Sequence, residues 1–306
     1  MRCNLSIRRN IDEPLQRPAA LRTDQHAEQL TQKKPHTIFF HRHSVDPRVT
    51  FMHTLVDIAP TIAEILGITL PFRDGTPIPT VVMKLSRCKR LILLIIDGLG
   101  YSTYEKYEHD LKPTGGLTLR CRPTVMHTFP LHGKCAFYGV EMHTTPAIAT
   151  ILTGMHPESH KIFTMTDTEQ SEKLSIIELA STQGITSAII MDEKGARCFK
   201  ENVIKIGVAD NDYNDNDAVR AVIEVSKRAN FITAHLRVLD RFYHQSKKPD
   251  KAIKILSHHI KDITAQIEDA GILICGDHPP HHLKNDDVPL IAISGRGDFE
   301  TNSRFA

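Results

Sequence analysis

The sequence lacks the features that mark several large classes of protein. Its charges are balanced, with 38 Lys and Arg against 36 Asp and Glu in 306 residues, so charge alone indicates no nucleic-acid or membrane partner. The longest apolar run, residues 91–96, is far too short to span a bilayer. No apolar segment of a secretory signal follows the first residues. We therefore expect neither a nucleic acid nor a membrane as partner.

None of the six cysteines belongs to a Cys-x-x-Cys pair, which excludes a zinc ribbon or a thioredoxin-like motif. Because the cysteines are widely spaced and no export signal is visible, we expect reduced thiols and a cytoplasmic protein. The composition, 41% hydrophobic and 24% charged, is that of a globular protein and excludes a collagen-like or disordered chain. Histidine is frequent, 18 of 306 residues, which favours a metal or phosphate site.

From residue 91 onward, short aliphatic segments alternate with amphipathic ones. This alternation predicts an α/β fold, with a mostly parallel central sheet and helices on both faces. Strands are expected at 91–96, 187–191, 203–208, 230–238, 271–275 and 288–295, and helices at 57–68, 145–154, 174–182, 216–228 and 250–268. Residues 1–35 are polar without a period, so we expect a loosely ordered arm followed by a single domain over 36–306.

Acidic and histidine residues follow three of the predicted strands. They are Asp97, the pair Asp240 and His244, and the pair Asp277 and His278. The carboxyl ends of parallel strands meet at one edge of a sheet, where ligands bind in such folds. Asp and His together are ligands for zinc, and also for manganese or iron. A single Asp after a strand is more often a helix cap or turn residue, but three such clusters together favour a metal site.

Four motifs follow one another as in the alkaline phosphatase superfamily. They are IIDGLG at 95–100, TTPAIATILTGMHPESHKI at 144–162, DRFYH at 240–244 and GDH at 276–278. Over residues 90–295 the chain resembles the nucleotide pyrophosphatase/phosphodiesterase-type members, which hold two metal ions, usually zinc, and use a Thr or Ser nucleophile. The resemblance implies an alkaline phosphatase-like core and a metal-dependent hydrolase of a small phosphate ester, with two divalent ions, zinc or else manganese.

The resemblance also implies which residues bind the two metals. For one metal they are Asp97, Asp277 and His278, and for the other Asp240, His244 and a histidine ahead of the V-P-L strand at 288–290. Both His281 and His282 precede that strand. The spacing favours His282, and the choice between the two stays open.

The nucleophile that the resemblance implies is Thr144. In the family it lies nine residues before the Thr of the T-G turn, here Thr153. Coordination to a metal would lower the pKa of its hydroxyl and make it a nucleophile, and the start of the helix favours an anionic phosphate. Alternatives are that Thr144 is a plain helix cap or that Thr145 is the nucleophile. Thr128, in HTFPLH, also resembles the family motif but lacks a T-G turn at the proper distance.

The chain departs from the family pattern at several positions. Ala147 stands where phosphodiesterase-type members often have an Asn that donates to the phosphate, and Pro279 replaces the usual glycine after Asp-His. The sulfatase signature C-x-P-S/A-x-R is absent. A phosphodiester or nucleotide pyrophosphate substrate is favoured over a monoester. The alternatives are a phosphomutase or phosphonate-cleaving relative, and a metal-binding scaffold without turnover.

The segment LVDIAPTIAEILGITLPFRDGTPI, at 55–78, resembles one that follows the V-P-L strand in many superfamily members. Here it precedes the rest of the domain, which suggests a circular permutation. The permutation requires residues 55–70 to lie near the strand at 288–294. The alternative is an unrelated amphipathic helix.

Overall fold

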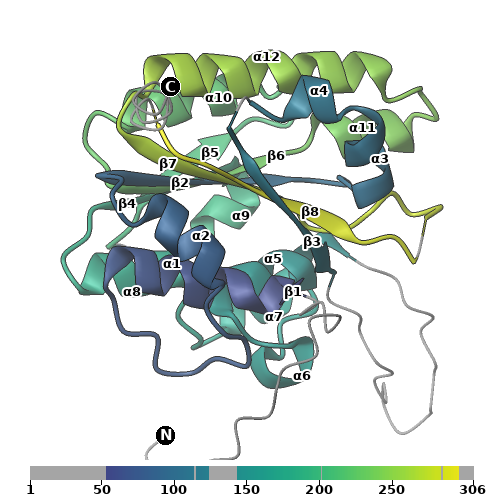
Figure 1. The fold of residues 1–306 in the computed structure, drawn as a ribbon. Helices are drawn as coiled ribbons and strands as arrows, with labels where there is room; N and C mark the ends of the chain where they lie inside the picture. Colours follow the sequence, from purple (N-terminus) through teal and green to yellow (C-terminus); the bar gives the residue numbers. More distant parts are fainter. Residues whose placement is uncertain (1–52, 114, 124–142, 201, 284, 296–306) are drawn as a thin grey trace, which may run out of the picture. The chain divides into compact units, whose positions relative to one another are not determined.

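The computed structural model describes residues 53–113, 115–123, 143–200, 202–283 and 285–295, which all lie in the compact unit Thr50–Ala306. The expected arm at 1–35 and the nucleophile alternative Thr128 lie outside the described residues. Within the described part of the chain, eight strands form one sheet in the order β1-β3-β8-β7-β2-β6-β4-β5. Figure 1 shows this sheet running through the middle of the domain.

The sheet is mostly parallel, as the alternation of segments predicts. β8 pairs antiparallel with β3 and β7, and every other pairing is parallel. The strands are β1 His53–Thr54, β2 Arg90–Ile96, β3 Leu117–Arg122, β4 Ser187–Asp192, β5 Ile204–Val208, β6 Phe231–Leu236, β7 Ala270–Gly276 and β8 Val288–Ile293. The predicted fold class is confirmed.

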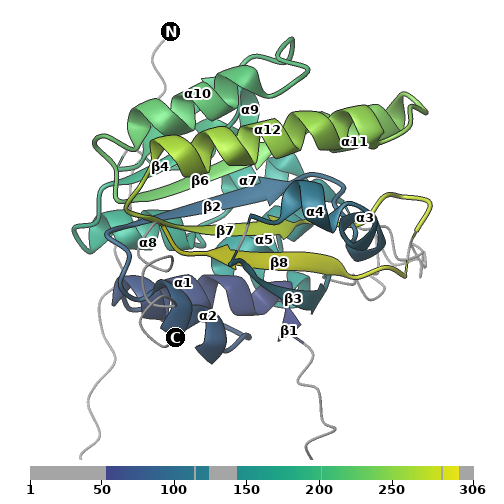
Figure 2. The ribbon, with the colours of Figure 1, turned by 45° about the horizontal axis from the view of Figure 1, so that its top comes forward.

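Helices cover both faces of the sheet (Figures 1 and 2). One face carries α3 Tyr101–Lys106, α4 Glu108–Leu111, α10 Asn216–Val225, α11 Val238–His244 and α12 Asp250–Gln266. The other carries α1 Ile58–Leu66, α2 Pro79–Leu85, α5 Thr144–Thr153, α8 Ile176–Thr182 and α9 Glu193–Arg197, with the short helices η1 Leu55–Asp57, α6 Pro157–His160 and α7 Met165–Gln170 nearby. None of the described helices has the length and apolarity that a membrane crossing requires.

Alternate residues of β2 point into opposite layers of the core. Ile92, Leu94 and Ile96 belong to the cluster that includes α10 and α12. Leu91, Leu93 and Ile95 belong to the cluster that includes α1, α5 and α8. Because side chains alternate along a strand, an unbroken aliphatic run serves both layers only when helices cover both faces.

The largest difference from the prediction lies at the end of β6. A strand was expected over 230–238, but β6 ends at Leu236 and Val238 begins α11. The Val238 N–H donates to Asp215 Oδ2 at 2.7 Å, so the start of this helix is held by an acceptor from another loop. Asp240 and His244 therefore lie one turn apart on a helix. The half-exposed strand β3 and the helix α2 were not predicted.

The segment at 55–78 belongs to the same core as β8. Leu55, Ile58 and Ile62 share one hydrophobic cluster with Val288 and Leu290, and the next helix, α2, contacts β8. α1 ends at Gly67, which has a left-handed backbone with φ of 65°, a conformation that glycine adopts readily at the end of a helix. Residues 55–62 therefore pack in the same layer of the core as β8.

Candidate active site

The two central strands bring two buried carboxylates to one edge of the sheet. β2 and β7 are parallel neighbours with Ile96 opposite Gly276, so Asp97 and Asp277, the next residue of each strand, emerge side by side. Both are buried. The backbone N–H of Gly98 donates to Asp277 Oδ1 at 3.1 Å, which ties the ends of the two strands together.

Thr144 and His278 meet at the same carboxylate. Thr144 is the first residue of α5, and its hydroxyl Oγ1 lies 3.4 Å from Asp97 Oδ1 and 3.3 Å from His278 Nε2. His278 Nε2 itself lies 3.2 Å from Asp97 Oδ1. The other ring nitrogen, Nδ1, donates to the carbonyl of Pro279 at 2.8 Å. Because that bond occupies Nδ1, Nε2 is the atom available for a metal ion.

The second cluster is centred on Asp240, which α11 places beside Asp97. Gly98 permits the approach, because its φ is 75° and a Cβ there would lie 3.2 Å from the Asp240 Cβ. His244, one turn along α11, places Nε2 at 3.0 Å from Asp240 Oδ2. Ligand atoms of Asp240, His278 and His281 lie within 4.8 Å of one another. Ligand atoms of Asp97, Asp277 and His278 also lie within 4.8 Å of one another.

The geometry favours His281 over His282 as the last histidine of the cluster, against the preference from spacing. The ring centroid of His281 lies 5.1 Å from that of His278 and 5.4 Å from that of His244. The ring of His282 instead packs edge-on against Tyr243, with centroids 5.8 Å apart. The two histidines are adjacent on a turn after Pro280, so their side chains leave the backbone in different directions, which spacing alone does not reveal.

The turn that follows α5 fixes how this helix packs, and therefore where its first residue lies. Gly154 has φ of 69°, and a Cβ there would lie 2.8 Å from the Pro60 Cδ, so the glycine allows α5 to pack closely on α1. Beyond this turn, the buried His160 pairs with Thr150 Oγ1 at 3.1 Å and accepts a hydrogen bond from the Ile162 N–H at Nδ1, at 2.9 Å. His160 therefore shapes this loop.

His235 was not predicted as a site residue. It lies in β6 opposite Ile95, is 5% exposed, and places Nε2 at 3.3 Å from Asp97 Oδ2. The other ring nitrogen, Nδ1, has no hydrogen-bond partner in the described structure. The available signal was a lone histidine in an otherwise apolar strand beside the strand that leads to Asp97. A second buried histidine, His259, places its Nε2 2.6 Å from the Asn214 carbonyl.

Charges in the cluster shift several pKa values. Burial alone would raise the pKa of Asp97, but hydrogen bonds from His235 and His278 lower it below its usual range. Burial and the charge of Asp97 raise the pKa values of Asp277 and Asp240. Burial opposes protonation of His278, yet the two neighbouring carboxylates raise its pKa to about 10. The negative charge of Asp97, Asp240 and Asp277 is therefore only partly neutralised by the neighbouring histidines. Such an environment favours the binding of cations.

The donor set fits divalent metal ions. Carboxylate oxygens and imidazole nitrogens are ligands that zinc and manganese both accept. The oxygens Asp240 Oδ1 and Asp277 Oδ2 are buried and lack hydrogen-bond partners in the described structure. Buried acceptors normally have a partner, and a coordinated cation would provide one.

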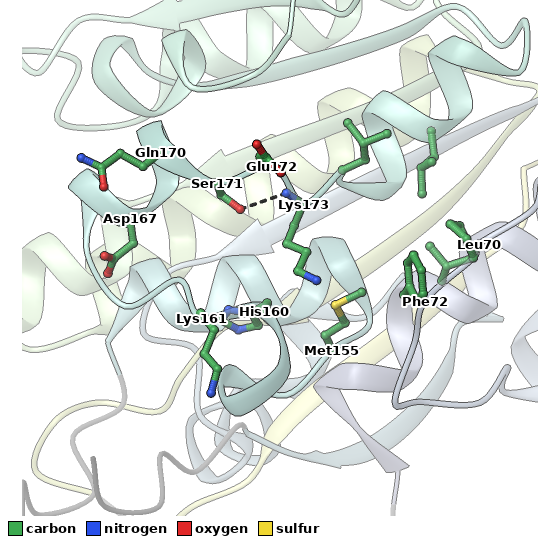
Figure 3. A pocket seen from close by; sticks show the side chains of 13 residues that line it. Leu70, Phe72, Met155, His160, Lys161, Asp167, Gln170, Ser171, Glu172 and Lys173 are labelled. Atoms are coloured by element: carbon green, nitrogen blue, oxygen red, sulfur yellow. Dashed lines mark hydrogen bonds between the residues drawn. The ribbon is translucent and has the colours of Figure 1, made fainter. Parts of the chain in front are cut away.

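Two hollows lie near α5. A cavity of about 140 Å³ is lined by Thr144, Thr145 and His235 together with apolar residues of α5, of the end of β4 and of the segment after α9. A larger hollow of about 610 Å³ lies beyond the turn after α5 (Figure 3). Its lining includes Phe72, Met155 and Lys161 but none of the clustered Asp and His residues.

No protein-family model matches the sequence, and no curated protein does. Solved structures similar to the chain include phosphonoacetate hydrolase from Sinorhizobium meliloti in complex with phosphonoformate, with 11% identity, TM-score 0.48, and coverage of 69% of this chain and 59% of that one. Murine ectonucleotide pyrophosphatase/phosphodiesterase 5 has 15% identity, TM-score 0.47, and coverage of 62% and 57%. The chain therefore spans less than two thirds of either protein.

A third similar structure is a protein in the alkaline phosphatase superfamily from Vibrio parahaemolyticus. It has 15% identity, TM-score 0.42, and coverage of 79% of this chain and 68% of that one. The solved structures thus include a member of the superfamily that the sequence motifs resemble. At these identities the likeness concerns the fold alone.

Proposed function

We propose that the chain is a metal-dependent hydrolase that transfers the phosphoryl group of an ester first to Thr144 and then to water. The observation that carries the proposal is the position of the Thr144 hydroxyl, 3.4 Å from Asp97 and 3.3 Å from His278 at the start of α5. A hydroxyl in a cluster of metal-ligand side chains, at a helix terminus suited to an anion, is the arrangement that phosphoryl transfer needs.

The proposed ligands form two groups around Asp97. They are Asp97, Asp277, His278 and Thr144 for one ion, and Asp240, His244 and His281 for the other. When bound, two divalent ions, zinc or manganese, would lower the pKa of the Thr144 hydroxyl and offset negative charge on the phosphate. The turn at Gly98 is proposed to keep the two groups adjacent, since it lies between Asp97 and Asp240 in space.

The chain's own residues act on the substrate in two steps. The N–H groups at the start of α5 bind phosphate oxygens, and Thr144 Oγ1 attacks phosphorus in line with the leaving oxygen. The bond between phosphorus and that oxygen breaks as the bond to Oγ1 forms, and the hydroxyl proton passes through solvent to the leaving oxygen. Water then attacks the phosphorus held by Thr144: its oxygen stays on phosphorus, the bond to Oγ1 breaks, the remaining phosphomonoester leaves, and a proton returns to Oγ1.

The proposed substrate is a phosphodiester or nucleotide pyrophosphate, hydrolysed in the cytoplasm. Ala147 offers no side-chain donor where phosphodiesterase-type members have one, so the N–H groups of α5 are proposed to bind the phosphate without it. We also propose that residues 55–78 are circularly permuted. The support is the core that they share with Val288 and Leu290.

The test combines metal analysis with hydrolysis of two chromogenic esters. The metal-loaded protein should hydrolyse bis-p-nitrophenyl phosphate faster than p-nitrophenyl phosphate. Thr144→Ala should keep its metal and lose about a thousandfold or more in rate, whereas Thr144→Ser should retain part of it. Full activity of Thr144→Ala would refute the nucleophile, and a native protein that binds no metal would refute the proposed function.

A further inference from the structure

The cavity of about 140 Å³ lies between α5, the end of β4 and the segment that follows α9. Most of its lining surface is apolar, and Ile148, Ala149, Leu152, Met165, Met191 and Phe199 contribute to it. Most of these residues are buried. Threonine and serine hydroxyls, Lys173 and Lys200 also line it. Thr144 and His235 line the same cavity, so it adjoins the hydroxyl proposed to carry the phosphoryl group.

The volume of the cavity limits what it can accept. A dry apolar cavity of about 150 Å³ binds a benzene molecule, whereas pockets for whole drug-sized ligands measure about 300–1,000 Å³. A volume of about 140 Å³ therefore holds a single ring or a branched alkyl group of similar size. A complete nucleoside is too large for it, so of the two substrate classes proposed above the cavity favours the phosphodiester.

The acidic groups that line the cavity are already satisfied within the protein. Glu178 accepts hydrogen bonds from the Ser175 N–H and hydroxyl and from the Lys200 N–H. Asp192 accepts one from the Gly195 N–H. His235 is also buried, and its Nε2 lies 3.3 Å from Asp97 Oδ2. The wall thus offers mainly apolar contact, together with the cations Lys173 and Lys200.

We propose that this cavity binds the organic group of the phosphate ester and selects esters of a phenyl-sized ring or a branched alkyl group. The inference rests on the proposed function, since Thr144 links the cavity to the phosphate. Burying such a group removes apolar surface from water, and only a group of this size fills the space. The larger hollow in Figure 3 does not compete for this role, because Thr144 is not among its lining residues.

The binding test compares two phosphonates that differ only in the organic group. Phenylphosphonate should bind the metal-loaded protein about tenfold or more tightly than methylphosphonate, measured by the shift in melting temperature. Ala149→Leu fills the cavity and should abolish this difference. Ala221→Leu makes the same change on α10, on the opposite face of the sheet, and should preserve it. If Ala149→Leu does not fold, Ala149→Val makes a smaller change in the same direction.

Toluene separates failure of this inference from failure of the proposed function, because it carries no phosphate. It should stabilise the native protein and Ala221→Leu but not Ala149→Leu. Equal binding of both phosphonates to the native protein would overturn the cavity's role and leave the phosphoryl chemistry intact. If neither phosphonate binds, the proposed function is overturned. Stabilisation by toluene would then test by itself whether the cavity binds an apolar group. An absence of stabilisation by toluene overturns the inference.

Discussion

His235 Nε2 lies 3.3 Å from Asp97 Oδ2, while the other oxygen of the same carboxylate, Oδ1, lies near Thr144 and His278. The histidine thus engages one oxygen of Asp97 and leaves the other facing the proposed metal site. Hydrogen bonds of this kind orient metal-binding carboxylates and raise their affinity for the ion. His235 is therefore a positioning residue for Asp97.

Replacing His235 should weaken metal binding in a graded way. His235→Leu removes the donor to Asp97 and should lower metal affinity about 10- to 100-fold, whereas His235→Gln keeps an N–H donor and should lose less. Titration of each variant with zinc against a competing chelator measures the effect. A leucine variant that binds zinc as tightly as the native protein would show that the contact does not orient Asp97.

Asp277→Asn should abolish stabilisation by zinc without destabilising the metal-free protein. An Asn Oδ1 still accepts from the Gly98 and His278 N–H groups, but the substitution removes one of two neighbouring buried charges. Burial and the charge of Asp97 raise the pKa of Asp277, which shows that its ionised form is disfavoured. The metal-free variant should be at least as stable as the metal-free native protein, and zinc should no longer raise its melting temperature.

The control for Asp277→Asn is Asp262→Asn, because Asp262 forms its ion pair, among the described residues, with the exposed His258 of α12. Its response to zinc should match that of the native protein. Strong stabilisation of Asp277→Asn by zinc would remove Asp277 from the ligand set.

His160 should make the stability of the fold depend on pH. Burial lowers the pKa of His160 from 6.5 to about 4. Between about pH 6.5 and pH 4 this side chain is therefore protonated in the unfolded chain but neutral in the folded protein. The free energy of unfolding should fall as the pH drops from about 6.5 to about 4, by up to about 3 kcal/mol. Denaturant titrations across this range measure the slope.

His160→Asn is the matched variant, since its amide oxygen can accept from the Ile162 N–H as Nδ1 does. The variant should be less stable at pH 7 but lose less stability on acidification. Identical slopes for the two proteins would assign the pH dependence to other groups.

Ile62→Ala tests whether the segment at 55–78 is part of the main core. Ile62 is fully buried in the cluster that contains Val288 and Leu290, so its truncation should cost about 2–5 kcal/mol of unfolding free energy in a single cooperative transition. Met83→Ala, at a side chain that is 73% exposed, should cost little. A separate early transition in Ile62→Ala would show that this segment folds as an appendage.

Much of the fold followed from local patterns in the sequence. The run at 91–96 could only be a strand with helices on both faces, and β2 lies at the centre of such a sheet. The glycines at 67 and 154 end their helices with positive φ values, which glycine adopts at little cost. The strand β3 was missed because its residues are largely half-exposed and so carry no strong hydrophobic signal.

Local sequence therefore determined the strands, the main helices and the chemistry of the side chains at the strand ends, because each depends on residues close together in the chain. Which side chains meet depended on the tertiary structure. The bend after β6 placed Asp240 on a helix, and the turn after Pro280 brought His281 rather than His282 to the cluster. His235 reached Asp97 through strand pairing across 138 positions of sequence that no local pattern encodes.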